Sequence, residues 1–509
     1  MNETREADVL VAGYGPVGAT VAALLGNAGF EVLVVDRERE VYRLPRAIAT
    51  DDDALRVWDT VPGLADRIRA EMIESLPVAY LSGDRTIVEV ETGLRRTPSR
   101  FPPFALFHQP TLEGQLRGAA RESGRVAEAL GVEVCSFEQV QEGVEVTLRD
   151  LDSGVKRRTK FGWLLGCDGA SSTVRAGLGS GFGGSTFTQK WVVADTEAGE
   201  DPTSARRVEF LCNPERPTVT MPMPGGRRRW EFMLMPGDLE EEMVEPRRLD
   251  DLVDRAGGKA PIGYERRVVY TFHARVADDW GTGRVFLLGD AAHVMPPFAG
   301  QGMTSGIRDA GNIWWKMAAV EEGRMGTDLM ETYELERRGH AGSMIDLAVR
   351  LGGIVQTPSR PKARLRDFIL RLAWLVPGVK SWTRRMGWKP DTRISRGFMK
   401  SGRSRPGSPE GRPFPSPEVL VDGNPKSFDS VVGPNFAVVS ACPDPIGSLD
   451  HETARMARDL GAREVTIANR GARDDVERVE DRTGEISRFL KGRTVIVRPD
   501  RFVFGTYRS

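Results

Sequence analysis

Residues 8–36 read DVLVAGYGPVGATVAALLGNAGFEVLVVD and predict the first layer of the fold. The apolar run 8–12 is typical of a short buried strand, and Gly13, Gly15 and Gly18 follow it at once. Apolar residues at helical spacing come next, and the run 31–35 predicts a second strand that ends at Asp36. In this order of strand, turn, helix and strand, the spacing GxGxxG indicates a dinucleotide site.

The glycine turn at the start of the helix can bind the phosphates of a dinucleotide. Its glycines, together with Pro16, let a pyrophosphate approach the bare helix N-terminus. Asp36 stands 18 residues after Gly18 and can accept a hydrogen bond from a ribose, and we expect Arg37 to line the same site. GSGFGG at 179–184 imitates a second fingerprint, but no apolar strand leads into it, so we interpret it as a loop. The turn alone leaves FAD and NAD(P) open.

A second stretch, residues 284–317, reads RVFLLGDAAHVMPPFAGQGMTSGIRDAGNIWWKM. Its apolar run 285–288 predicts a buried strand that stops at Gly289, so Asp290 lies at a strand's carboxyl end, where open α/β sheets bind ligands. A Pro- and Gly-rich turn follows, and a helix is expected from Met303. Gly300 and Gly302 leave backbone N–H groups accessible, and the helix dipole favours an anionic ring. This combination suits a flavin.

The second stretch resembles the GD motif of the FAD-dependent aromatic hydroxylases, the class A flavoprotein monooxygenases, whose pattern GDAAHxxPPxxGQGMxxGIxDAxNxxWK it matches almost letter for letter. Residues 45–47 (PRA) and 168–175 (DGASSTVR) resemble two further motifs of that family. The resemblance is good over residues 1 to about 345 and looser beyond them, and it is strongest to the 3-(3-hydroxyphenyl)propionate and polyketide hydroxylase branch. Asp36 departs from it, since many relatives carry Glu there.

The resemblance implies a set of cofactor contacts. FAD would occupy the first fingerprint, and NAD(P)H would visit transiently without a Rossmann domain of its own. Arg46 would lie against the flavin, Gln109 would bond its ribityl or phosphate region, and Asp168 with Arg175 would serve the pyrophosphate and the nicotinamide. The expected contacts in the GD motif are Gly289, Asp290, Pro297, Gly300, Gly302 and Met303. His293 is expected to pack rather than to catalyse.

The implied reaction belongs to the cofactor more than to any side chain. In the family, NAD(P)H reduces FAD, O2 adds at flavin C4a, and the hydroperoxide transfers its distal oxygen to an electron-rich aromatic ring. No catalytic side chain is assigned. Candidates for the substrate pocket are Arg229 for a carboxylate, Trp230 for a wall and Pro297 for the other side of the ring; a solvated Arg229 and a core Trp230 are equally open. A reductase or a non-oxygenating flavoprotein that shelters an aromatic intermediate is the alternative function.

The chain divides into several expected parts. We predict an α/β fold with a Rossmann-like FAD-binding domain, a β-sheet substrate domain and a small thioredoxin-like C-terminal domain. The FAD-binding domain would be discontinuous, at 1–75, 101–180 and 276–345, and the β-rich substrate domain would take 76–100 and 181–275. A helical segment at 346–400, a linker at 401–417 and the C-terminal domain at 418–509 complete the chain. A helix is expected over 112–130.

The resemblance implies a small aromatic substrate as the partner, and composition argues against other kinds of partner. The 71 basic and 72 acidic residues nearly cancel, which argues against nucleic acid. Four scattered cysteines offer no metal spacing and favour a reduced, cytoplasmic setting. The basic segment 360–388 could touch an anionic membrane, but such arginines are more often the wet face of a packed helix, so we expect no stable membrane association. A homodimer stays open.

Overall fold

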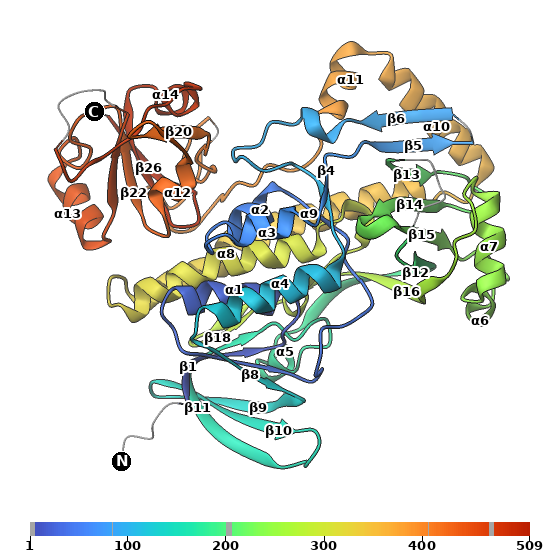
Figure 1. Cartoon of the computed structure of the whole chain (residues 1–509), viewed down its shortest axis with the longest axis horizontal. Helices are drawn as coiled ribbons and strands as arrows, with labels where there is room; N and C mark the ends of the chain where they lie inside the picture. The colour runs from blue at the N-terminus through green and yellow to red at the C-terminus, as the bar shows by residue number, and fades with distance from the viewer. Residues whose placement is uncertain (1–5, 84, 200–205, 406, 468–472, 509) are drawn as a thin grey trace.

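The computed structural model describes residues 6–83, 85–199, 206–405, 407–467 and 473–508. Figure 1 shows two large sheets with helices packed between and around them, and a smaller body made by the C-terminal residues. The chain passes between the two large sheets several times, so each is built from segments far apart in sequence. The domain boundaries given above stay predictions.

The first sheet has a parallel centre in the order β18, β11, β1, β2, β8. These strands are β1 (Ala7–Ala12), β2 (Val32–Asp36), β8 (Val126–Leu130), β11 (Lys156–Gly166) and β18 (Val285–Leu287). The hairpin β9 (Val132–Val140) and β10 (Gly143–Asp150) extends β11, and β17 (Gly281–Thr282) pairs with β18. The predicted Rossmann-like layer is confirmed, and burial explains the apolar runs 9–12 of β1, 32–35 of β2 and 285–287 of β18.

Three helices lie side by side over this sheet, with α1 (Pro16–Asn27) touching both α4 (Gln109–Glu122) and α8 (Gly302–Glu321) (Figure 1). Shorter elements join them: α2 (Asp52–Trp58), α3 (Leu64–Arg69), α5 (Thr173–Gly177) and the small sheet of β3 (Ala49–Thr50), β7 (Ala105–Leu106) and β4 (Ile73–Glu74). Asp51 caps α2 by accepting hydrogen bonds from the N–H groups of Asp53 and Ala54. Aspartate is a favoured N-cap residue, so the stretch 51–58 (DDDALRVW) predicts this capped start from the sequence alone.

Two element predictions are wrong. The helix expected over 112–130 ends at Glu122, because Gly124 takes a left-handed φ of 69° and residues 126–130 pair with β2 as β8. Within 179–184, the expected loop covers only the first three residues, and β12 starts at Phe182. A Cβ on Gly184 would lie 2.0 Å from the carbonyl oxygen of Ala274, so this glycine permits a close approach of two strands rather than a phosphate turn.

The second sheet faces the first across the middle of the molecule and has the order β19, β16, β12, β15, β14, β13, β5, β6. Its strands are β5 (Val78–Ser82), β6 (Arg85–Val90), β12 (Phe182–Thr196), β13 (Val208–Leu211), β14 (Thr218–Met223), β15 (Arg227–Met233), β16 (Tyr264–Ala277) and β19 (His293–Val294). The sequence did not anticipate α6 (Glu240–Met243) and α7 (Pro246–Arg255), whose apolar residues cover the outer face of β12 and β15.

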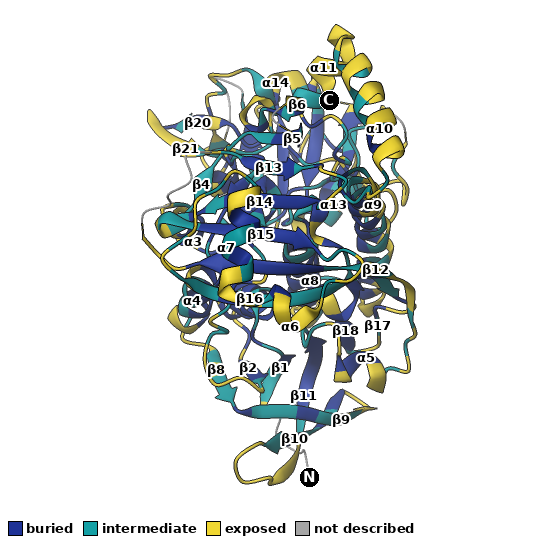
Figure 2. Cartoon of the chain, turned by 90° about the vertical axis from the view of Figure 1, so that its right-hand side faces the viewer, coloured by how far each residue is buried: buried dark blue, intermediate teal, exposed yellow. Residues whose placement is uncertain are grey.

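Three further helices follow α8: α9 (Thr332–Val355), α10 (Arg360–Trp374) and α11 (Pro377–Arg384). Figure 2 shows α10 and α11 as largely exposed helices at the rim of the molecule, beside the edge strand β6. Basic residues were expected to form the wet face here, yet large apolar side chains are exposed as well. Of the helices that the structure describes, none is both long enough and apolar enough to cross a bilayer.

The C-terminal body is a mixed five-stranded sheet in the order β24, β23, β22, β25, β26. Its elements are β22 (Ala437–Ser440), β23 (Arg463–Thr466), β24 (Glu477–Arg478), β25 (Arg493–Val497), β26 (Val503–Arg508), α12 (Phe428–Val432), α13 (His451–Asp459), α14 (Glu485–Leu490) and the hairpin β20 (Glu418–Val421) with β21 (Asn424–Ser427). Phe414 of the expected linker is fully buried in this body, so the segment is packed rather than a free tether.

Candidate functional site

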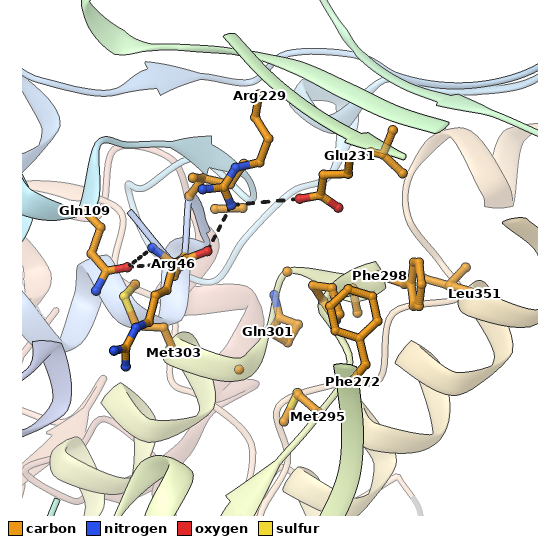
Figure 3. Close-up of a pocket in the computed structure, with 18 of the residues that line it drawn as sticks. Arg46, Gln109, Arg229, Glu231, Phe272, Met295, Phe298, Gln301, Met303 and Leu351 are labelled. Atoms are coloured by element: carbon orange, nitrogen blue, oxygen red, sulfur yellow. Dashed lines mark hydrogen bonds and ion pairs between the residues drawn. The ribbon is translucent and has the colours of Figure 1, made fainter. Parts of the chain in front are cut away.

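A cavity of about 630 Å³ lies between the carboxyl ends of the first sheet and the inner face of the second. Its motif end is lined by Gly15, Pro16, Arg46, Gln109, Asp290, Gly300, Gly302 and Met303. Its apolar end is lined by Tyr80, Phe210, Val219, Met221, Phe272, Phe298 and Leu351. Figure 3 shows the two ends facing each other, with Gln109 and Met303 on one side and Phe298 and Leu351 on the other. The fold thus joins the predicted motifs to an apolar chamber.

Two glycines of the fingerprint, Gly13 and Gly18, leave no room for a side chain. A Cβ on Gly13, whose φ is 97°, would lie 2.4 Å from the carbonyl oxygen of Cys167, and one on Gly18 would lie 1.9 Å from that of Gly13. Gly15 is the N-cap of α1 and makes no side-chain capping bond, so the first amides of the helix face the cavity as bare backbone. A cradle of this kind fits a pyrophosphate.

Asp36 ends β2 beside this turn. Its carboxylate accepts hydrogen bonds from the backbone N–H groups of Tyr14 and Glu38, which fix the loop around it. Each carboxylate oxygen keeps a second lone pair, so a ribose hydroxyl can still bind. Neither Asp36 nor the exposed Arg37 is among the residues that line the cavity, so both contacts stay predictions.

The GD motif places a carboxylate and a helix N-terminus in the cavity wall. Asp290 makes no hydrogen bond to any described residue; its side chain is accessible from the cavity, while surrounding protein raises its pKa by desolvation. Gly300 has a φ of 61°, and α8 begins two residues later without a side-chain cap. His293 packs as expected: its Nε2 lies 2.7 Å from Asp309 Oδ2, and both are buried.

The PRA loop is held above this wall by Gln109. Its Oε1 accepts hydrogen bonds from the backbone N–H groups of Arg46 and Ala47, each at 2.7 Å (Figure 3). The guanidinium of Arg46 lies 4.4 Å over the ring of Tyr42 and is exposed. Gln109 therefore shapes the loop, and its amide nitrogen faces only Glu113 at 3.5 Å.

Asp168 and Arg175 do not line the cavity. The Asp168 carboxylate accepts from the N–H groups of Thr173 and Val174 at 2.7 and 3.1 Å and caps the start of α5, and burial raises its pKa. The Arg175 guanidinium donates to the carbonyls of Ala170 and Ala291 at 2.6 and 2.9 Å. In this structure Arg175 ties residues 168–175 to the GD motif, and Asp168 holds the turn within those residues; contacts to a nucleotide stay predictions.

Arg229 lines the cavity, but its donors are occupied. Nε and Nη2 bond the Asp195 carboxylate at 2.6 and 2.7 Å, and Nη2 and Nη1 donate to the carbonyls of Pro45 and Arg46 at 2.6 and 2.9 Å. Burial disfavours the cation, yet Asp195 holds its pKa above the ordinary value. Arg229 therefore ties the PRA loop to the second sheet and has no free prong for a substrate carboxylate.

The prediction that Trp230 walls the substrate is wrong. Successive residues of a strand point to opposite faces, and Trp230 packs on the outer face with Phe232, Leu249 and Val253. The core alternative for this residue is confirmed. Pro297 lies where it was expected, in the cavity wall next to Phe298.

Arg266 is a residue that the sequence analysis missed. Its Nη1 donates to the carbonyl of Pro45, whereas Nε and Nη2 are buried and find no partner among the described residues. Burial and the nearby Arg229 lower its pKa to about 10, so it stays a cation at neutral pH. The four-residue spacing of Arg266 and Tyr270 on one strand, which puts both on one face, was the available signal.

Known proteins resemble this chain over its whole length. A family profile described as an FAD binding domain matches residues 6–348, and one described as the HcaD C-terminal domain matches residues 411–509. The 3-(3-hydroxy-phenyl)propionate/3-hydroxycinnamic acid hydroxylase of Comamonas testosteroni is 33% identical over 98% of this chain and 94% of its own. The 3-(3-hydroxy-phenyl)propionate/3-hydroxycinnamic acid hydroxylase 2 of Burkholderia vietnamiensis is 34% identical over 97% of this chain and 92% of its own. The crystal structure of aklavinone-11 hydroxylase with FAD and aklavinone aligns with a TM-score of 0.78 at 25% identity, over 100% of this chain and 97% of the other.

Proposed function

The chain belongs to the FAD-dependent aromatic hydroxylases, and we propose that it hydroxylates a small aromatic acid in the apolar end of the cavity. It is a flavoprotein monooxygenase with FAD as its cofactor, and NAD(P)H and O2 are the co-substrates typical of its family. The observation that carries the proposal is the continuity of the cavity from the two glycine turns to an apolar chamber beneath the second sheet.

The residues at the motif end fit FAD. The amides at the start of α1 suit the pyrophosphate, Asp36 suits the adenosine ribose, and the uncapped start of α8 suits the electron-rich edge of the flavin ring. When bound, FAD supplies the activation of O2 for transfer of one oxygen atom to the substrate. The protein supplies position: Gln109 and Arg229 hold the PRA loop against this site from opposite sides.

The apolar end suits an aromatic ring. Tyr80 and Phe210 stack with their centroids 4.8 Å apart, and Phe272 meets Phe298 edge-on at 5.6 Å. An apolar lining of this kind limits side reactions of a reactive oxygen species with water. Orientation then requires a polar contact, because stacking alone leaves the ring free to slide.

Arg266 supplies that contact in the proposal. Its two unpartnered donors form one prong of a guanidinium, which suits a carboxylate bound through two hydrogen bonds. A buried cation with unsatisfied donors is costly unless a ligand completes it. The relatives named for phenylpropionate and cinnamic acid substrates support an acid of this size.

The test combines a substrate panel with one variant. Purified protein should show flavin absorbance, and matched phenols with and without a carboxylate should stimulate NAD(P)H oxidation unequally, with a product heavier by one oxygen atom. Arg266→Gln should raise KM for the acid roughly tenfold to hundredfold while flavin content stays unchanged. Arg267→Gln, on the exposed side of the same strand, is the control.

Other outcomes would redirect the assignment. Equal use of acids and neutral phenols by the wild type would remove the acid from the proposal. NAD(P)H oxidation with no oxygenated product in any member of the panel would favour the second candidate, a reductase or an FAD protein that shelters an aromatic intermediate. We also infer a cytoplasmic location, supported by four unpaired cysteines, and a homodimer, which a mass measurement in solution would test.

A further inference from the structure

The outward face of α10 and α11 is apolar over its whole length. We call it the rim face and define it by Leu365, Phe368, Ile369, Leu372, Leu375 and Trp382, whose side chains are between 53% and 77% exposed. The first four stand at spacings of three and four residues and therefore share one side of α10. Figure 2 shows this side at the edge of the molecule. Exposed apolar patches of this extent mark binding surfaces.

The orientation of α10 is set by contacts on its other side. Ala363 is buried, and Leu370 and Trp374 pack against the apolar core of the second sheet. Arg366 donates to the carbonyls of Ile354 and Cys212 at 2.9 and 2.8 Å, and Asp367 accepts from Ser82. Helix α10 thus has two apolar sides. The inner side packs against the rest of the chain, and the outer side, the rim face, is exposed.

The charges on the helices that carry the rim face are mostly positive. Residues 360–385 hold eight basic residues and a single acidic one, in a chain whose net charge is -1. The basic residues that are exposed and form no ion pair with any described residue are Lys362, Arg364, Arg371, Lys380 and Arg385. A second copy pressed onto this face would bring two basic rims together, which is unfavourable. A partner that complements this face must offer both an apolar surface and negative charges.

We propose that the rim face docks α10 and α11 in the surface plane of an anionic lipid bilayer. The apolar side chains enter the boundary between headgroups and acyl chains, and the basic rim meets lipid phosphates. Trp382 has the amphipathic ring that prefers this depth. Met386 and Trp388, shortly after α11, line the apolar end of the cavity, so docking would bring that end close to the lipid. The docking does not depend on the proposed substrate.

The test is co-sedimentation of the flavin-loaded full chain with vesicles. The protein should sediment with phosphatidylglycerol vesicles and stay in the supernatant with phosphatidylcholine vesicles. Rising salt should release it from the phosphatidylglycerol vesicles. Phe368→Glu with Trp382→Glu should weaken binding at least roughly tenfold. Replacing Lys362, Arg364 and Arg371 by glutamine should weaken it roughly fivefold per residue. Ile262→Glu is the matched control, because Ile262 is 95% exposed and lies outside the rim face.

Three results would overturn the proposal. The first is no retention on phosphatidylglycerol at low salt, and the second is equal retention of the wild type and the double glutamate variant. The third is a dimer in solution that the double variant dissociates, which would assign the rim face to a second copy. Because all substituted side chains are exposed, circular dichroism and flavin content should stay at wild-type values in every variant.

Discussion

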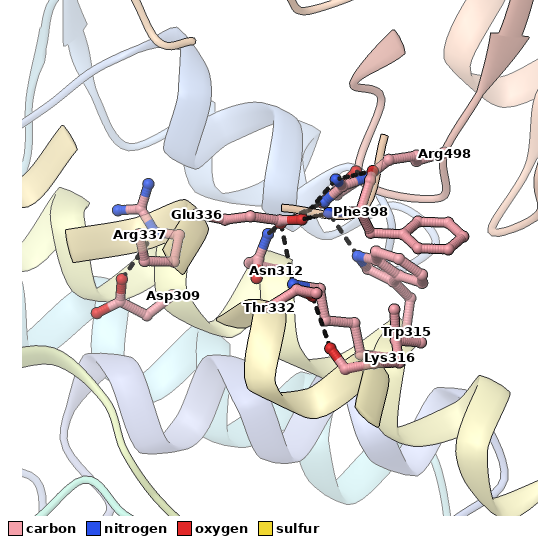
Figure 4. A network of polar contacts seen from close by, with 11 residues as sticks. Asp309, Asn312, Trp315, Lys316, Thr332, Glu336, Arg337, Phe398 and Arg498 are labelled. Carbon is pink, nitrogen blue, oxygen red and sulfur yellow. Dashed lines mark hydrogen bonds and ion pairs between the residues drawn. The ribbon is translucent and has the colours of Figure 1, made fainter. Parts of the chain in front are cut away.

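Replacing Glu336 by glutamine should loosen the C-terminal body from the rest of the chain. Glu336 lies on α9 and accepts hydrogen bonds from Lys316 of α8 at 2.9 Å and from both terminal nitrogens of Arg498 at 2.9 and 2.7 Å (Figure 4). The N–H groups of Asn312 and Phe398 also donate to it, at 2.7 and 2.8 Å. All three charged side chains are buried, and Arg498 also pairs with Asp500, so two carboxylates balance two cations and the loss of Glu336 leaves one positive charge uncompensated.

The size of the effect follows from this burial. Removing one partner of a buried ion pair leaves an uncompensated charge and costs about 3–5 kcal/mol. A body of about 100 residues, such as 411–509, shifts its unfolding midpoint by about 4–8 °C per kcal/mol, so the transition that reports it should fall by roughly 12–40 °C. The glutamine keeps the shape of the side chain, which isolates the charge as the cause.

The pH dependence gives an independent measure. Burial alone would raise the pKa of Glu336, but Arg498 and Lys316 outweigh it and lower the pKa to about 2, from an ordinary value of 4.5. The folded-state pKa is depressed, so the stabilisation is fully present above about pH 4.5 and is lost as the pH falls towards 2. The shift corresponds to about 3 kcal/mol, in agreement with the first figure. Wild type and variant should therefore converge in acid.

Thermal unfolding followed by calorimetry, together with limited proteolysis of the C-terminal body, would measure both effects. Asp459→Asn is the control: its ion pair with Arg455 spans 3.7 Å with both side chains more than half exposed, and such pairs contribute at most about 1 kcal/mol. A midpoint for Glu336→Gln within about 1 °C of the wild type at neutral pH would refute the reasoning.

Two further changes test the motif end. Asp290→Ala should lower the ratio of bound FAD to protein by roughly fivefold without loss of folding, because the carboxylate faces the cavity and bonds no described residue; full flavin retention with full activity would contradict this. Arg175→Ala should slow anaerobic reduction by NAD(P)H roughly tenfold while FAD binding is affected less, because the carbonyls of Ala170 and Ala291 lose the tie between their loops. An unchanged stopped-flow reduction rate would count against that role.

Features encoded within short stretches could be predicted from the sequence. The glycine turn at Gly13–Gly18, the capped start of α2 and the break before α8 depend on backbone conformation and on neighbours a few residues away. The central strands β1, β2 and β18 were equally predictable, since residues 9–12, 32–35 and 285–287 are apolar and buried. The helix expected over 112–130 failed where a left-handed glycine and a distant strand outweighed local helical character.

The sequence by itself determined the order of the motifs, the flavin chemistry they imply and the alternation of residues along each strand. Alternation distinguishes two faces without saying which one meets the cavity, so only the tertiary structure placed Trp230 in the outer core and Arg266 in the chamber. Long-range partners were hidden for a related reason: Arg229 is matched by Asp195, and Glu336 by Arg498 across 162 positions. The energy of a buried charge depends on what surrounds it in space, and adjacency in the chain carries no record of that.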